Sequence, residues 1–385
     1  MTLRVCIPLV CHMALLFVRP LSLHAGELDV RWLGEVQKSP QREVSFDVGF
    51  MEPLLMRKSG GEVHNPDEWQ ERRRELIEAW DDFLGPSPQT PEGIATQLLK
   101  SESVGGVIRD LIRYECEPNL FVEAYLLRPA HVTEGTLLPG IVALHHTAQD
   151  TIDEIAGVSG PDSRKLGLKL AQRGFVVICP RCFLWQDAPS LTAAVDRYRA
   201  RHPESLGMRK MLFDARRAVD ILEAQPHVDR TRIGAVGHSL GAKEVLYLAA
   251  FDERIKAAVA SEGGMALKST NWDAPWYLGP QIHEASFGRN HHELVALIAP
   301  RAFLVLGGET GPGAADGDRS WPLIGAALPV YRLFSDSPRL GLLNHGQGHT
   351  IPDDVYERLA EWLGTYLSQK AVAALKLDGI QVDTK

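Results

Sequence analysis

Cysteine is scarce in the sequence, and positive charge is not in excess. Five cysteines occur among 385 residues, and 41 lysines and arginines stand against 49 aspartates and glutamates. Two of the cysteines precede residue 26, and the three that remain are too few for a disulfide framework. The net charge of −8 gives no electrostatic reason to expect nucleic acid or an anionic membrane as a partner.

Long hydrophobic runs are also missing, except at the N-terminus. Residues 1–25 combine an early Arg4 with an apolar stretch from Val5 to Val18 and end in Ala25, which is the layout of a secretory signal peptide. No later segment offers the roughly 18 apolar residues that span a membrane. We therefore expect a secreted or periplasmic protein whose mature chain has no membrane span. The sequence does not indicate an oligomeric state.

Motifs for a bound cofactor are absent as well. Cys179 and Cys182 form a C-x-x-C pair, but no second pair completes a zinc site. The sequence does not decide whether these two cysteines form a local disulfide. With no nucleotide or metal motif in the chain, we expect no cofactor.

The chain divides into an N-terminal extension at 26–107 and a larger domain at 108–385. The extension contains a well-marked helix at 65–84, which Asn65 can cap and Pro66 can begin. Trp69, Leu76 and Trp80 repeat at helical spacing, which is typical of packing residues. The extension is expected to be helical rather than an independent domain.

The larger domain alternates short apolar runs with amphipathic segments. Two antiparallel strands at 111–117 and 120–129 are followed by strands at 140–146, 175–179, 232–237, 255–261, 301–308 and 339–344. Helices are expected at 163–173, 208–225, 240–251 and 353–368. This order predicts an α/β fold with a mostly parallel central sheet and helices on both faces, in an α/β-hydrolase arrangement.

The stretch from Gly237 to Gly241 reads G-H-S-L-G between a predicted strand and a predicted helix. In that setting G-x-S-x-G forms a nucleophile elbow, a strained turn that exposes its serine above the sheet. Ser239 is therefore the predicted nucleophile. The amide of Leu240 and one near His146 or Thr147, after the first parallel strand, would stabilise the oxyanion.

A serine nucleophile needs a base and an acid further along the chain. His349 follows Gly348 in a loop before the last predicted helix, so we favour it as the base over His345. Asp318 is the first choice for the acid because D-x-x-W-P follows a predicted strand. The alternatives for the acid are Asp316, Glu309 and Glu262.

With these residues in place, 108–368 resembles α/β-hydrolases of the dienelactone-hydrolase-like and bacterial acetyl-xylan-esterase-like groups. The resemblance is carried by "DARRAVDILEAQPHVDRTRIGAVGHSLG", "AAFDERIKAAVASEGG" and "HELVALIAPRAFLVLGG". It implies a metal-free serine hydrolase. Dienelactone hydrolases proper carry cysteine at the nucleophile, where this chain has Ser239, so their substrate is not implied.

The chain is also more distantly similar to glucuronoyl esterases. Ser239, Lys243 and "AFDERI" at 250–255 match the spacing of that family, whereas Leu240 stands where those enzymes carry arginine. The resemblance implies that Lys243 contacts a sugar hydroxyl or carboxylate. The alternative is that Lys243 is a solvent-exposed or ion-paired helix residue. Trp276 and Trp321 are candidates for a sugar platform, and packing is the alternative for both.

The leading interpretation is an exported serine ester hydrolase that forms an acyl-enzyme. The substrate expected from the resemblance is a small-molecule or polysaccharide ester, with short acyl groups removed from polysaccharide. The alternatives are a glucuronoyl-esterase-like enzyme, a peptidase of the prolyl-oligopeptidase type, and a non-catalytic binding protein on a hydrolase scaffold.

Overall fold

The structure is a computed structural model that describes residues 28–41, 44–148, 150–186 and 188–377. The expected signal peptide at 1–25 lies outside the described residues. Among the residues that are described, no helix is long and apolar enough to cross a membrane.

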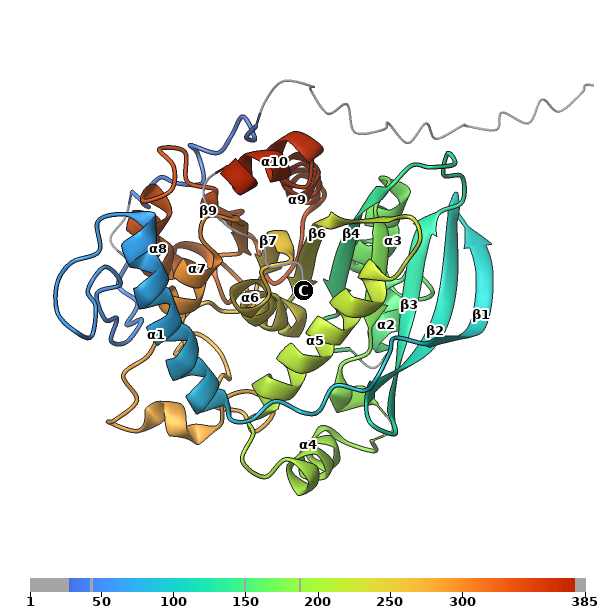
Figure 1. Ribbon diagram of the computed structural model, residues 1–385, viewed down its shortest axis with the longest axis horizontal. Helices are drawn as coiled ribbons and strands as arrows, with labels where there is room; N and C mark the ends of the chain where they lie inside the picture. Colours follow the sequence, from blue (N-terminus) through green and yellow to red (C-terminus); the bar gives the residue numbers. More distant parts are fainter. Residues whose placement is uncertain (1–27, 42–43, 149, 187, 378–385) are drawn as a thin grey trace, which may run out of the picture.

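A single nine-stranded sheet runs through the molecule (Figure 1), in the order β1-β2-β3-β5-β4-β6-β7-β8-β9. The first three strands are antiparallel, β3 pairs antiparallel with β5, and every later pair is parallel. The strands are β1 Thr96–Val104, β2 Val107–Glu117, β3 Leu120–Pro129, β4 Leu138–Leu144, β5 Val176–Pro180, β6 Val228–His238, β7 Ile255–Ser261, β8 Ala302–Gly307 and β9 Leu340–Asn344. The predicted, mostly parallel sheet is confirmed.

Helices cover both faces of this sheet. The helices are α1 Pro66–Leu84, α2 Thr151–Ile155, α3 Leu166–Gln172, α4 Leu191–Arg201, α5 Gly207–Glu223, α6 Leu240–Phe251, α7 His292–Ile298, α8 Trp321–Arg332, α9 Asp353–Tyr366 and α10 Gln369–Leu377. One hydrophobic cluster joins one sheet face to α1, α5, α6, α7 and α8, and a second joins the other face to α3, α9 and residues 30–36.

The N-terminal extension is part of this architecture. Asn65 caps α1 by accepting a hydrogen bond from the amide of Glu68, and the Glu68 carboxylate accepts one from the amide of His64. Trp69 and Trp80 are fully buried, as their spacing predicts. The sheet begins at Thr96, so the segment assigned to the extension also supplies β1, which is an edge strand exposed along most of its length.

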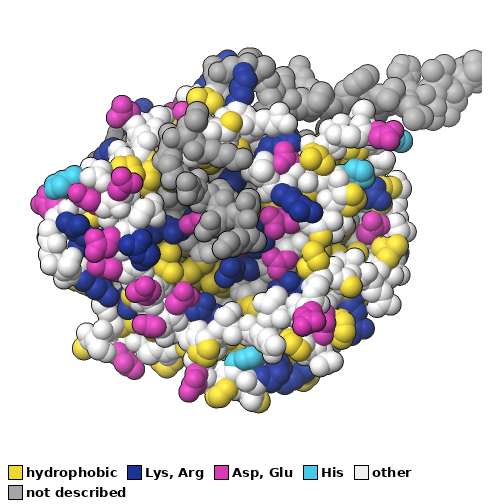
Figure 2. Space-filling view, viewed as in Figure 1, with side chains coloured by type: hydrophobic (Ala, Val, Ile, Leu, Met, Phe, Trp, Pro, Cys, Tyr) yellow, Lys and Arg dark blue, Asp and Glu magenta, His cyan; other side chains and the backbone are white. Residues whose placement is uncertain are grey.

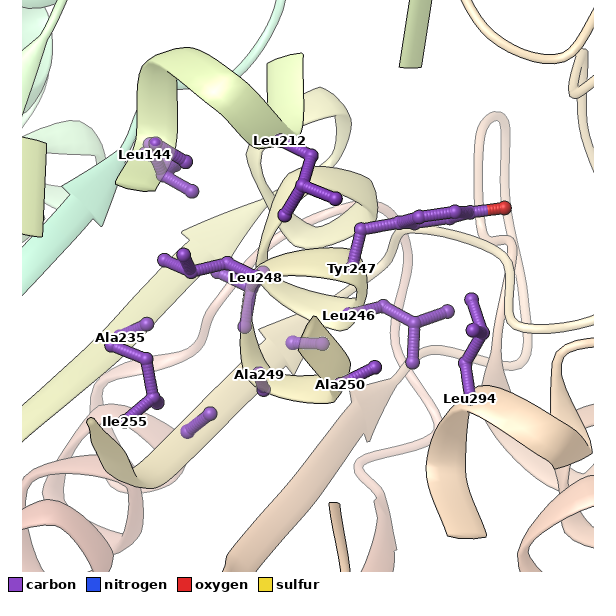
Figure 3. Close-up of a cluster of buried hydrophobic side chains, with 14 of the residues drawn as sticks. Leu144, Leu212, Ala235, Leu246, Tyr247, Leu248, Ala249, Ala250, Ile255 and Leu294 are labelled. Carbon is purple, nitrogen blue, oxygen red and sulfur yellow. The ribbon is translucent and has the colours of Figure 1, made fainter. Parts of the chain in front are cut away.

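Helix α6 lies at the centre of the larger cluster. Every residue from Leu240 to Ala250 is buried, and Leu246 and Leu248 pack among Leu212 of α5 and Leu294 of α7 (Figure 3). A helix that is buried on all sides has no solvent-facing stripe, which identifies α6 as an interior element although it carries Lys243 and Glu244. Ser239 is the residue immediately before this helix, so the predicted nucleophile is held by one of the most deeply buried helices of the fold.

The remaining cysteines lie inside the protein as free thiols. Cys179 belongs to the cluster on the α3 side of the sheet, and Cys182 belongs to the cluster on the α5 side. Because the two side chains pack on opposite faces, the C-x-x-C pair does not form the local disulfide that the sequence left open. Cys116 is also a buried free thiol.

The surface seen in Figure 2 carries basic and acidic side chains interspersed with one another. Elsewhere among the described residues, ion pairs join Arg173 to Glu357 and Arg254 to Glu223.

Candidate active site

The turn at Ser239 has the strained geometry of a nucleophile elbow. Ser239 adopts φ 59° and ψ −115°, directly between β6 and α6, and its amide donates to the carbonyl of Ser261 at 2.8 Å. A Cβ on Gly237 would lie 2.3 Å from the carbonyl of Gly241, and one on Gly241 would lie 2.1 Å from the Leu144 carbonyl. The two glycines are therefore required by the close approach of strand and helix.

Ser239 opens into a cavity of about 290 Å³ at the carboxyl ends of the parallel strands. This catalytic cavity, as we call it, has polar and aromatic walls. Its lining includes Thr147, Ser239, Lys243, Glu262, Trp276, Tyr277 and His349. Ligand sites of open α/β sheets are found at this edge.

His349 lies on the loop between β9 and α9 and faces the same cavity. Its ring is half-buried against that of His238, with 4.6 Å between the ring centroids. Burial lowers the pKa of His349 below its ordinary value, Glu262 opposes this effect by its negative charge, and Arg164 adds to it by its positive charge. The imidazole is thus held in the neutral form that a general base requires.

The four candidate acids have different surroundings. Asp318 accepts a hydrogen bond from Asn344 Nδ2 at 2.7 Å, and Glu309 accepts one from the same nitrogen at 3.0 Å. Asp316 is fully buried and accepts hydrogen bonds from the amides of Gly264 at 3.0 Å and Met265 at 2.7 Å. Of the four, Glu262 lines the catalytic cavity together with Ser239 and His349.

Glu262 follows β7 directly and is buried to 1% exposure. Its left-handed backbone, with φ 56°, directs the side chain into the loop ends, where it accepts hydrogen bonds from the amides of Gly308 and Ala315. Amide donors of this kind stabilise the ionised carboxylate. Of the candidate acids, the one that acts electrostatically on His349 is Glu262.

His345, the alternative base, lies beside Glu262. Its Nδ1 accepts from the amide of Gln347 at 3.2 Å, which places the proton of the neutral ring on Nε2. That Nε2 is 3.5 Å from Glu262 Oε1. The arrangement makes His345 a neighbour of the acid, while His349 shares the cavity with the serine.

The loop after β4 positions the predicted oxyanion donors through His145. His145 Nε2 accepts from the amide of Cys182 at 3.0 Å, so its Nδ1 carries the proton and donates to the His146 carbonyl at 2.8 Å. Because a peptide bond is planar and trans, this bond directs the Thr147 N–H the opposite way. Thr147 lines the catalytic cavity, whereas the His146 ring faces Glu154, with 3.0 Å between Nε2 and Oε2.

Lys243 is buried in the wall of the catalytic cavity, rather than exposed or ion-paired. Its Nζ lies 3.6 Å from the centroid of the Trp272 ring and donates to Thr270 Oγ1. Among the described residues, no carboxylate oxygen lies within 4.0 Å of this ammonium group. Burial lowers the pKa of Lys243 well below its ordinary value.

The aromatic candidates for substrate contact fall into two groups. Trp276 and Tyr277 line the catalytic cavity, and Trp185 joins them from the loop after β5. Trp321 lies at the start of α8 and packs against the core instead. Sequence reasoning missed Trp185, for which the only signal was its place after a predicted strand.

The described part of the chain contains no cluster of three or more histidine, cysteine or carboxylate side chains suited to a metal ion.

Comparison with known proteins agrees with this geometry. Residues 122–284 match the dienelactone hydrolase family. The Bacillus subtilis (strain 168) protein YtaP, named as a hydrolase, is 25% identical over 62% of this chain and 80% of its own length.

Solved structures show the same fold. The glucuronoyl esterase from Solibacter usitatus superposes with a TM-score of 0.68 at 18% identity, over 83% of this chain and 99% of that one. A Bacteroides fragilis NCTC 9343 protein named as an acetyl xylan esterase gives 0.57 at 16% identity, over 82% and 89% of the two chains. The elbow, the sheet order and these matches together show that the chain has the α/β-hydrolase fold.

Proposed function

We propose that the protein is a serine esterase that cleaves carboxylic esters of carbohydrates. The observation that carries this proposal is the convergence of Ser239, His349 and Glu262 on one cavity, with Ser239 in the strained elbow conformation. The α/β-hydrolase fold and the match of residues 122–284 to the dienelactone hydrolase family support a hydrolase. The esterase chemistry rests on the structural neighbours named above.

In the proposed reaction, His349 accepts the Ser239 proton as the hydroxyl attacks the ester carbonyl. The amides of Leu240 and Thr147 stabilise the oxyanion, each contributing about 3–4 kcal/mol to the transition state. Protonated His349 then gives its proton to the leaving alcohol, which leaves an acyl-enzyme. Water, activated by the same imidazole, attacks the acyl-enzyme and releases the acid.

Glu262 is the proposed acid in place of Asp318. Its charge favours the protonated form of His349 that develops during attack, and its carboxylate is held in place by hydrogen bonds from backbone amides. Asp318 is instead hydrogen-bonded to Asn344. The loop conformations that decide between the two carboxylates could not be read from their sequence spacing.

Two carbohydrate substrates are compatible with the cavity. Trp276 and Tyr277 can stack on a sugar ring, which suits acetylated xylan. The buried Lys243 lines the cavity and could hydrogen-bond an oxygen of a uronate sugar, which favours a uronate ester. Leu240 lacks the positive charge found after the serine in glucuronoyl esterases, which favours the acetyl ester.

The test compares hydrolysis of p-nitrophenyl acetate, acetylated xylan and a methyl glucuronate ester by the wild type and by Ser239→Ala. We expect Ser239→Ala to lower kcat by a factor of about 10⁴ or more. Ser103→Ala, on the exposed strand β1, is the matched control and should leave kcat unchanged. A fluorophosphonate should label the wild type at Ser239.

Full activity in Ser239→Ala, or labelling elsewhere, would rule out the proposed nucleophile. A folded wild type that is inactive on every ester would turn attention to peptide substrates or to a binding role. Of the two natural esters, the one cleaved with the higher kcat/KM identifies the substrate class.

The proposal includes export of the mature chain, which the N-terminal sequence of residues 1–25 supports. Expression of the full chain in a bacterial host tests this directly. An extracellular or periplasmic product that begins near residue 26 is expected, and a full-length cytoplasmic product would overturn it.

A further inference from the structure

A second, smaller cavity lies behind the base, separate from the catalytic cavity. It has a volume of about 20 Å³ and shares no lining residue with the catalytic cavity. Its polar side chains come from His146, Ser163, Arg164, His238 and Thr350, and the rest of its wall is aliphatic. His238 and Thr350, which line the small cavity, directly adjoin in sequence Ser239 and His349, which line the catalytic cavity.

His238 presents an unused hydrogen-bonding nitrogen in this small cavity. The side chain is only 7% exposed, and its Nε2 has no hydrogen-bond partner among the described residues. Its Nδ1 faces Ser261 Oγ at 3.1 Å, and a hydroxyl that donates there leaves the ring proton on Nε2. A buried N–H without an acceptor is costly, which calls for an occupant that accepts a hydrogen bond.

Arg164 supplies positive charge at the same place. It lies in the 3-10 turn Asp162–Arg164, and among the described residues no carboxylate oxygen lies within 4.0 Å of its guanidinium. Its charge acts on the other cavity residues as well. The pKa of His146 is lowered to about 3, mainly by burial and then by Arg164.

We propose that this cavity binds one small monovalent anion of the halide class. Arg164, the His238 N–H and the hydroxyls of Ser163 and Thr350 are all able to donate to it, and the aliphatic remainder suits a weakly hydrated ion. The volume accommodates a single atom or a water molecule and is too small for acetate or sulfate. Glu154 faces the cavity side chain of His146 but is already engaged with its Nε2 at 3.0 Å.

The bound anion would act on catalysis through the base, and this consequence rests on the proposed function. The charged groups that act on His349 are Glu262, from the end of β7, and Arg164, from the 3-10 turn. His238, whose ring is tilted by 45° against that of His349, is itself influenced by His349, Arg164, His146 and His345. An anion beside Arg164 offsets that positive charge and so raises the pKa of His349.

Binding is tested first, without reference to activity. Crystals of the protein grown without halide are soaked in sodium bromide, and anomalous diffraction is recorded at the bromine edge. An anomalous peak is expected within hydrogen-bonding distance of His238 Nε2, and Arg164→Gln should abolish it. Lys165→Gln removes a neighbouring cation that pairs with Asp162 outside the cavity, so it should retain the peak.

The kinetic arm measures kcat/KM against pH in sodium chloride and in sodium gluconate at equal ionic strength. In the wild type and Lys165→Gln, chloride should raise the pKa of the acid limb by about half a pH unit or more. In Arg164→Gln the two salts should give the same profile. Thermal unfolding of each variant establishes that the chains are folded.

An ordered water without anomalous signal, or a bromide peak of equal height in Arg164→Gln, overturns the anion site. A bromide peak with superimposable pH profiles overturns the coupling to the base. Because the diffraction experiment needs no substrate, loss of the esterase proposal and loss of the anion site are distinguishable.

Discussion

Two buried lysines in neighbouring helices have opposite surroundings. Lys210 of α5 lies 2.6 Å from Asp214 Oδ1 and 2.6 Å from Glu117 Oε1, so these carboxylates raise its pKa despite burial. Lys243 of α6 has an aromatic ring and a hydroxyl for neighbours, and burial lowers its pKa.

The different surroundings distinguish a lysine that stabilises the fold from a lysine that is available to a ligand. An interior ion pair with its partners in place holds elements together, and here it joins β2 to α5. An interior cation without a carboxylate costs stability and is retained where a cavity exposes it to a substrate. Glu117, Lys210 and Asp214 form the first region, the Lys210 cluster.

The largest expected difference comes from neutralising one glutamate in each region. Glu262→Gln should lower kcat by a factor of about 10³–10⁴, because His349 then lacks the charge that stabilises its protonated form. Glu117→Gln should leave kcat within about twofold and lower the free energy of unfolding instead, since Lys210 loses a partner. Rates on p-nitrophenyl acetate and urea unfolding measure the two effects.

Asp318→Asn is the matched control for the acid and should change kcat by less than about tenfold. If Asp318→Asn is the more damaging variant and Glu262→Gln stays active, the acid is Asp318.

Replacing each lysine by methionine gives the next largest effect. Lys210→Met should reduce the free energy of unfolding by about 3–5 kcal/mol, because it leaves the buried Asp214 without its cation, while Glu117 keeps His202 and Arg201. Lys243→Met should change it by less than about 1 kcal/mol, since Asp316, the buried carboxylate that acts on Lys243, lies beyond ion-pairing distance and keeps its own hydrogen bonds from Gly264 and Met265. Urea denaturation followed by far-UV circular dichroism measures both, and equal losses would remove the distinction between the regions.

Lys243→Met should instead affect substrate recognition. We expect kcat/KM for the carbohydrate ester to fall by about 10- to 100-fold, with less than a threefold change for p-nitrophenyl acetate, which lacks a sugar. Lys268→Met, at an exposed lysine paired with Asp47, is the control and should resemble the wild type. If Lys243→Met lowered kcat/KM equally for both esters, Lys243 would have no specific role in binding the sugar.

The smallest effect concerns pH. His349 must be neutral to accept the proton of Ser239, and its lowered pKa keeps it neutral in mildly acidic solution. The acid limb of kcat/KM should therefore lie below the ordinary imidazole value of about 6.5. Glu262→Gln removes the charge that raises this pKa, so its residual activity should show an acid limb lower still, by about one pH unit or less.

Variants of the Lys210 cluster should leave the acid limb unchanged, because those charges do not act on His349. An acid limb well above pH 6.5 in the wild type would contradict the effect of burial described here.

The comparison also marks what the sequence could predict. The elbow at Ser239 and the order of the strands follow from short-range patterns, namely glycine spacing and apolar runs between amphipathic segments. The acid depends on how separate loops fold back over the strand ends, and the left-handed backbone of Glu262 places its carboxylate in the wall of the cavity that His349 also lines. Such long-range placement leaves no local pattern in the chain.

The burial of Lys243 was equally out of reach, because a lysine one turn into a helix is usually solvated. Its surroundings come from Trp272 and Thr270, which lie on a loop that the sequence alone could not place. The same holds for Cys179 and Cys182, whose spacing suggested a pair but whose side chains point to opposite faces of the sheet.

The complete burial of α6 implies an order in which the site would come apart. Ser239 begins an interior helix that is wrapped by α5, α7 and the sheet, so its backbone amides should exchange with solvent only when the whole domain unfolds. His349 sits on a surface loop whose opening disturbs far fewer contacts. In mild denaturant the loop that carries His349 should therefore open first. The protein would then be inactive while Ser239 keeps its native backbone conformation.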